Sequence, residues 1–130
     1  MSINTNEKIT INMSAIDLGK VDLLVEEGFY SNRTDFIRTA IRNQLDRHDD
    51  ELKSQVLRRE FVMGVLVHTR EGLEKRLAKN ETMRIRVVGV VVIEDDVPPE
   101  LADKTIESVK VLGIFRANKV VKEVLADRIL

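Results

Sequence analysis

The chain has 130 residues, of which 43% are hydrophobic, so it can bury a core in one domain or in two small ones. Its formal net charge of −1 excludes a protein whose whole surface is coated with positive charge for nucleic acid. The absence of cysteine excludes disulfides and thiolate metal sites and suits a cytoplasmic setting. We expect neither a membrane-spanning segment nor a secretory signal, because no stretch has the required apolar length or pattern.

The first predicted element is a β-strand over residues 8–13, where polar and apolar side chains alternate without interruption. One face would hold Ile9, Ile11 and Met13, and the other would hold Lys8, Thr10 and Asn12. A single strand followed by helical sequence cannot satisfy its own backbone hydrogen bonds, and the simplest partner is the same strand of a second copy. The side chains of the polar face can hydrogen-bond to base edges in a major groove, so this face is a candidate for reading DNA.

Two amphipathic helices are predicted after the strand. Ser14 is placed to cap the first helix, with Asp17 three residues later, and Gly28 is placed to end it. Ser31 is the candidate cap of the second helix. The apolar stripes of the two helices consist of Leu18, Val21 and Val25, and of Phe36, Ile37, Ala40, Ile41 and Leu45.

The order strand, helix, tight turn, helix resembles the ribbon-helix-helix repressors of the CopG/Arc/MetJ class over roughly residues 7–47. The most specific part is the segment Gly28–Arg42, GFYSNRTDFIRTAIR, which looks like the turn and second helix of that family. The resemblance implies an intertwined homodimer with a two-stranded ribbon in the major groove of double-stranded DNA. It implies base contacts from Lys8, Thr10 and Asn12, phosphate contacts from Ser31, Asn32 and Arg33 at the start of the second helix, and a dimer core of Ile9, Ile11, Met13, Leu18, Val21, Phe36, Ile37, Ala40 and Ile41.

The charge of the N-terminal part argues against DNA binding. Residues 1–50 contain six Lys or Arg and nine Asp or Glu, and six minus nine gives a net charge of −3. We expect Arg38, Arg42 and Arg47 to lie on a solvated helix face, at pairing distance from Asp35 and Asp46. This balance leaves open a protein-binding role for the same fold, such as that of an antitoxin.

The fold class predicted is α+β, with a ribbon-helix-helix domain over residues 1–47, a helical linker over 48–59 and a C-terminal α/β module over 60–130. The module contains an internal repeat. Residues 85–91 align without a gap on residues 109–115, an offset of 24, and a weaker copy begins at Val62. Each unit is an apolar run centred on a glycine, at positions 64, 89 and 113, followed by a helical stripe. Near-continuous apolar strands are typical of parallel sheets, so we expect about three strand-helix units side by side, which would serve oligomerisation or regulation.

An alternative for the same module is an ACT-like βαββαβ domain, as in nickel-responsive repressors. Strands at 61–68, 84–93 and 106–116 with helices at 70–79 and 118–128 would nearly suit it, although a last strand is missing. A nickel site needs several His and Cys, and this chain has two His and no Cys, so nickel sensing is not expected. A small organic effector remains open.

No catalytic constellation, cofactor motif or metal site is predicted, so we expect no enzyme. The sequence favours a cytoplasmic, sequence-specific transcriptional regulator, a repressor that binds a palindromic operator as a homodimer. The C-terminal module would join such dimers into a tetramer or sense a partner. The two rivals are an antitoxin and a self-assembling scaffold in which the ribbon is only a dimer clamp.

Overall fold

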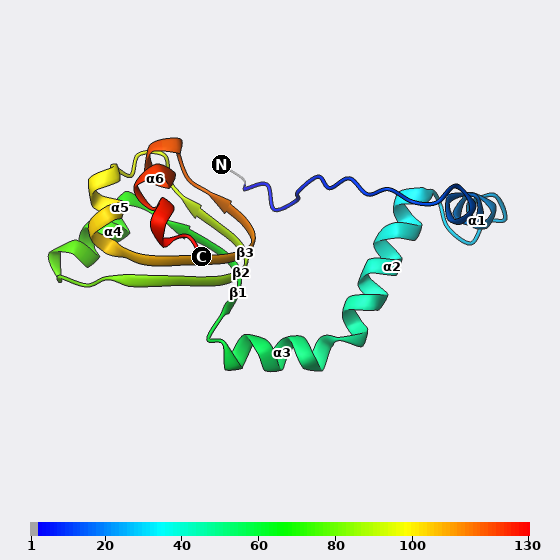
Figure 1. Ribbon diagram of the computed structural model, residues 1–130, viewed down its shortest axis with the longest axis horizontal. Helices are drawn as coiled ribbons and strands as arrows, with labels where there is room; N and C mark the ends of the chain where they lie inside the picture. The colour runs from blue at the N-terminus through cyan, green and yellow to red at the C-terminus, as the bar shows by residue number, and fades with distance from the viewer. Residues whose placement is uncertain (1–2) are drawn as a thin grey trace. The chain divides into compact units, whose positions relative to one another are not determined.

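A computed structural model describes residues 3–130 and divides the chain into two compact units (Figure 1). The first unit comprises Lys8–Gln55. The second comprises Val56–Leu130 together with the segment that ends at Glu7. Each unit has its own architecture and is described by itself.

The first unit contains two helices joined by a tight turn. Helix α1 spans Ala15–Glu26, and the Ser14 hydroxyl caps it by accepting the Asp17 N–H at 3.1 Å. Gly28 follows the helix with φ of 84°, the left-handed conformation that the sequence predicted for a terminating glycine. Helix α2 spans Arg33–Arg47, and α3 spans Asp49–Arg58 after a break at His48.

One predicted detail of this unit is wrong, and one stays a prediction. Residues 8–13 are not assigned to a strand in the single chain, and the strand predicted there needs the same segment of a second copy to accept and donate its backbone hydrogen bonds. The cap of α2 is Asn32 rather than Ser31, since the Asn32 side chain accepts the Asp35 N–H at 2.8 Å.

The second unit is a three-stranded parallel sheet of strand order β1-β2-β3 with helices between and after the strands. Its elements are β1 (Val62–His68), α4 (Arg70–Ala78), β2 (Met83–Ile93), α5 (Pro99–Thr105), β3 (Ile106–Arg116), α6 (Lys119–Val124) and a short 3-10 helix, Ala126–Arg128. Three strand-helix units therefore follow one another. The βαββαβ alternative is wrong, because α5 separates β2 from β3 and the two strands are parallel.

The hydrogen-bond register of the sheet follows the sequence repeat. Ile85 lies opposite Val109, an offset of 24, and Gly64, Gly89 and Gly113 form one row across the three strands. All three glycines have positive φ, between 127° and 148°. A Cβ on Gly89 would lie 2.1 Å from the carbonyl oxygen of Gly64. The two strands can therefore approach this closely only because the residue is glycine.

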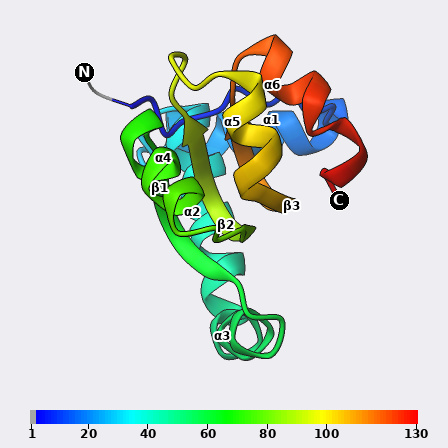
Figure 2. The ribbon, with the colours of Figure 1, turned by 90° about the vertical axis from the view of Figure 1, so that its left-hand side faces the viewer.

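The helices α4, α5 and α6 lie on the same side of the sheet (Figure 1, Figure 2) and bury its core against them. The helices contribute Leu73, Leu101, Ala102, Val121 and Leu125, and the strands contribute Ile85, Val87, Val91, Ile93, Ile106 and Val109. Along β2 these core residues fall at every second position, as strand periodicity requires, whereas Ile106 lies at the irregular start of β3.

The opposite side of the sheet carries no helix of this unit. By alternation its apolar side chains fall in register rows, Met63-Val88-Leu112 and Val65-Val90-Ile114, with Val67 and Val92 in the next row. Met63 is 59% exposed and Val65 is 47% exposed, whereas Val90 in the central strand is only 5% exposed. We call these eight residues the open face. Near its end, Ile3 borders a hollow with Val67 and Val92, and Arg116 donates a hydrogen bond to the Asn4 carbonyl.

Candidate nucleic-acid interface

The segment 8–13 presents both sets of its side chains to solvent in the single chain. Lys8, Thr10 and Asn12, the predicted base readers, are all exposed. Ile9 and Ile11, which alternate with them, are 71% and 58% exposed. An apolar row this open has no cover within the chain, so the segment has the side-chain pattern of a strand and no partner for it.

The rest of the first unit is also poorly covered. Among residues 8–55, Val21 alone is buried, while Leu18, Phe36 and Ile37 are half-buried. Of the other predicted dimer-core residues, Met13, Ala40 and Ile41 are exposed. One buried side chain cannot offset the conformational entropy of ordering some fifty residues, which costs roughly 1–2 kcal/mol per residue for the backbone.

The start of α2 is held by two reciprocal hydrogen bonds. Asn32 Oδ1 accepts the Asp35 N–H, and Asp35 Oδ2 accepts the Ser31 N–H at 2.9 Å. The N–H groups of Arg33 and Thr34 have no acceptor among the residues that the structure describes. Two free donors at the positive end of a helix dipole are what an anion such as a phosphate requires.

Arg33 is engaged within its own chain. Its guanidinium forms a bidentate ion pair with Asp22 of α1, with Nε–Oδ1 at 2.7 Å and Nη2–Oδ2 at 2.8 Å. The hydrogen bonds from Arg33 lower the pKa of the Asp22 carboxyl, and Asp22 in turn raises the pKa of Arg33. This ion pair links α1 to the start of α2 across the turn. It also neutralises the positive charge of Arg33, which the resemblance implied as a phosphate contact.

A polar hollow of about 590 Å³ lies along the first turns of α2. It is lined by Ser31, Asn32, Thr34, Asp35, Arg38, Thr39 and Arg42. Sequence reasoning gave Arg38 and Arg42 to a solvated face paired with carboxylates, yet neither has an ion pair in the described part of the chain. The sequence did contain a signal for this grouping, because positions 34, 38 and 42 are four residues apart and share one face of the helix.

The model of the Ribbon-Helix-Helix transcriptional regulator family matches residues 4–122, which is most of the chain. The chain belongs to this family. The ribbon-helix-helix regulator is also 33% identical over 45 residues to the transcriptional regulator CdrS of Halobacterium salinarum, covering 35% of this chain and 82% of that protein. No solved structure matches it.

Membership makes this ribbon-helix-helix protein a DNA-binding transcriptional regulator rather than a member of an enzyme family. The match runs through both units, whereas the resemblance seen in the sequence stopped near residue 47. The described residues contain no helix long and apolar enough to cross a membrane, and they hold no group of three or more His, Asp or Glu placed for a metal ion.

Proposed function

We propose that this protein is a homodimeric repressor that reads a palindromic operator with an antiparallel ribbon made from residues 8–13 of two copies. The observation that carries the proposal is the exposed, alternating and unpaired segment itself. Pairing two such segments satisfies their backbone groups and turns Ile9, Ile11 and Met13 toward a shared core. The thin core of residues 8–55 supports the same conclusion, since a second copy supplies the missing cover.

In this dimer Lys8, Thr10 and Asn12 are the base readers. Asn offers a paired donor and acceptor that match adenine, and Lys donates to guanine. We assign the phosphate contacts to Ser31, Asn32 and Arg33 at the start of α2. Arg33 contributes its free backbone N–H, because its side chain is bound to Asp22. Arg38 lies beside them in the same hollow and adds the free positive charge.

The domain roles follow the same division. Residues 1–47 bind DNA and dimerise, 48–59 form a helical linker, and 60–130 join dimers into a tetramer through the open face. Parallel sheets are normally covered on both faces, which supports burial of this one. A second copy is the occupant we propose, because each ribbon-paired dimer carries two such faces, so two dimers can meet through both faces at once and gain from bivalent binding. Regulation of transcription then takes place in the cytoplasm.

The test of DNA reading is selection of bound duplexes from a random library with purified protein at moderate salt. We expect a short palindromic or repeated motif, which the Lys8/Thr10/Asn12 triple alanine variant loses. Thr10→Ala and Asn12→Ala alone should each weaken specific binding by roughly 1–3 kcal/mol. A matched control is Lys79→Ala with Thr82→Ala, which removes similar exposed groups in the other unit. A folded dimer that enriches no sequence contradicts the proposal and favours a protein partner, as for an antitoxin.

The test of the open face is the oligomeric state of the full chain by light scattering across a concentration series. Val65→Lys places a charge at the centre of the face and should convert a tetramer into a dimer. Val120→Lys on α6, which is 52% exposed and outside the face, should leave the tetramer intact. A wild-type mass of two chains at every concentration contradicts assembly of dimers through this face. A mass that grows without limit favours the scaffold.

A further inference from the structure

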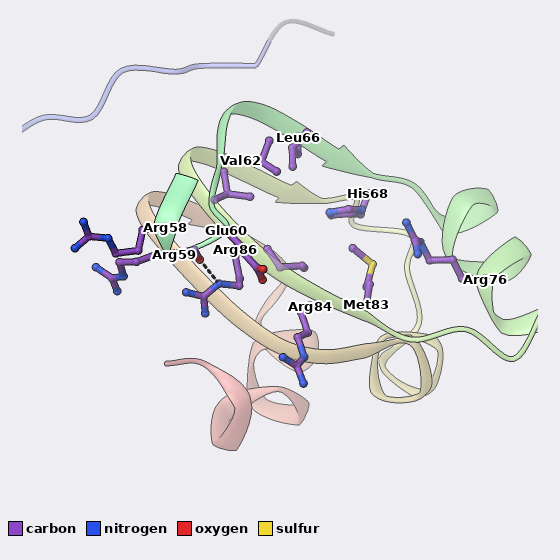
Figure 3. Close-up of a pocket in the computed structure, with 12 residues that line it drawn as sticks. Arg58, Arg59, Glu60, Val62, Leu66, His68, Arg76, Met83, Arg84 and Arg86 are labelled. Carbon is purple, nitrogen blue, oxygen red and sulfur yellow. Dashed lines mark hydrogen bonds between the residues drawn. The ribbon is translucent and has the colours of Figure 1, made fainter. Parts of the chain in front are cut away.

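A second recess lies within the C-terminal unit, where β1 begins. Its volume is about 680 Å³, within the range of small-molecule sites. It is bordered by the residues that precede β1, by β1 itself, by the start of β2 and by α4 (Figure 3). The recess exists because β2 starts four residues before its first partner in β1, with Val62 opposite Val87. Residues 83–86 therefore have no neighbouring strand on that side.

Five arginines line this recess: Arg58, Arg59, Arg76, Arg84 and Arg86. Glu60 is the one carboxylate among the lining residues. Arg84 has a partner, Glu107, at 3.5 Å. For the other four, no carboxylate of the described residues lies within ion-pair distance. Such a concentration of like charge in a chain of net charge −1 raises the electrostatic energy of the folded state unless an anion compensates it.

Two of these guanidinium groups are held in place. Arg86 Nε donates to the Arg59 carbonyl oxygen at 3.0 Å. The guanidinium carbons of Arg59 and Arg86 lie 4.9 and 4.8 Å from the centre of the Phe61 ring, which is itself buried. Stacking on an aromatic ring fixes the orientation of a guanidinium while leaving its remaining N–H groups free to bind.

The floor of the recess is apolar. Val62, Leu66, Met83, Ile85 and Val87 contribute to it. His68 also lines it, and its Nε2 is buried with no hydrogen-bond partner in the described residues. In the close-up, the ring of His68 and the side chain of Arg76 lie toward each other above Met83 (Figure 3). An unpaired buried nitrogen beside free guanidinium groups offers further polar recognition to a bound molecule.

We propose that this recess binds a small phosphorylated organic anion with a flat, apolar body, of the nucleotide class. The arginines bind the phosphates, for which guanidinium groups have matching geometry, and the apolar floor takes the flat body. Duplex DNA fits less well, because its phosphates lie on a convex surface that leaves an apolar floor unused. The site is distinct from the segment that reads DNA, so its occupancy is a candidate effector signal for the regulator.

The experiment is a calorimetric titration of the full chain with ADP, with inorganic pyrophosphate and with adenosine, each in turn. We expect ADP to bind more tightly than pyrophosphate, and adenosine to bind more weakly than either. The double variant Arg76→Gln with Arg86→Gln should lose at least tenfold in ADP affinity. Arg70→Gln, in the same helix as Arg76 but outside the recess, should keep it. Failure of ADP and pyrophosphate to bind at millimolar concentration, or equal ADP affinity in the double variant, overturns the proposal.

A second readout locates the ligand without relying on a variant. The chain has two histidines, His48 and His68, so an NMR spectrum of the imidazole groups contains two sets of signals. ADP should shift the signals of His68 and leave those of His48 in place. Unmoved His68 signals with ADP bound refute the assignment. Displacement of ADP by a duplex of random sequence would also refute it, and would show that the arginines contact DNA backbone.

Discussion

The row of glycines across the sheet allows a sharp prediction about the stability of the C-terminal unit. Gly64 and Gly89 have nearly the same backbone conformation, with φ of 148° and 140°. They differ in surroundings, because a Cβ on Gly64 meets nothing within 4 Å, whereas a Cβ on Gly89 lies 2.1 Å from the Gly64 carbonyl oxygen. The pair Gly64→Ala and Gly89→Ala therefore separates backbone strain from steric clash.

The magnitudes follow from this comparison. Gly64→Ala should cost only the strain of an unfavourable φ, about 1–3 kcal/mol. Gly89→Ala bears the same strain and must also push a backbone carbonyl away by about 1 Å. That movement breaks ladder hydrogen bonds, each worth about 1 kcal/mol, and leaves groups unpaired at about 1–3 kcal/mol apiece. We expect Gly89→Ala to be destabilised by about 2–4 kcal/mol more than Gly64→Ala, a large share of a typical domain stability of 5–15 kcal/mol.

The assay is urea unfolding followed by circular dichroism at one fixed protein concentration, with amide exchange of β2 peptides as a local readout. Gly113→Ala should cost about as much as Gly89→Ala. Its Cβ would lie 2.1 Å from the Gly89 carbonyl oxygen, so both clashes fall between the central strand β2 and an edge strand. Equal costs for Gly64→Ala and Gly89→Ala would refute the argument that close strand contact selects glycine here.

Two further predictions concern single side chains. Burial lowers the pKa of His68 below its usual value of 6.5, with a smaller effect from Arg76, so the unfolded chain binds this proton more readily. The resulting stability is present above pH 6.5 and is lost as the pH falls through the lower folded pKa. In His68→Gln, the free energy of unfolding measured in urea should therefore change less between pH 7 and pH 5 than in the wild type. Asn32→Ala should cost about 1 kcal/mol by removing the α2 cap, whereas Ser31→Ala should cost less, since the cap bond comes from Asn32. Similar losses of stability in these last two variants would contradict the cap assignment.

The C-terminal unit was the more predictable half. A gapless offset of 24 between two apolar runs anticipated the pairing of Ile85 with Val109, because stacked equivalent units place equivalent residues side by side. The positions of the strands followed from their apolar runs.

Other features depend on contacts that sequence spacing does not reveal. The strand predicted over residues 8–13 would need a partner from outside the chain, and the single chain has no strand there. Asp22 lies eleven residues before Arg33, and only the turn between α1 and α2 brings them together. Two neighbouring residues, Ser31 and Asn32, were both good cap formers, and local geometry decided between them. The arginines of the recess come from three separate segments, which no local motif could connect.

The coincidence of repeat period and strand register has a consequence for how such a module changes in length. Since each strand pairs with the next at the same offset that separates their sequences, one whole unit can be duplicated without altering any pairing already present. The short pairing of Val109 with Ile129, together with the bond from the Leu130 N–H to the Val109 carbonyl, shows that the outer edge of β3 accepts a further parallel segment. The architecture is modular: a duplicated segment of about 24 residues, inserted in register, would widen the sheet by one strand and extend each row of the open face by one side chain.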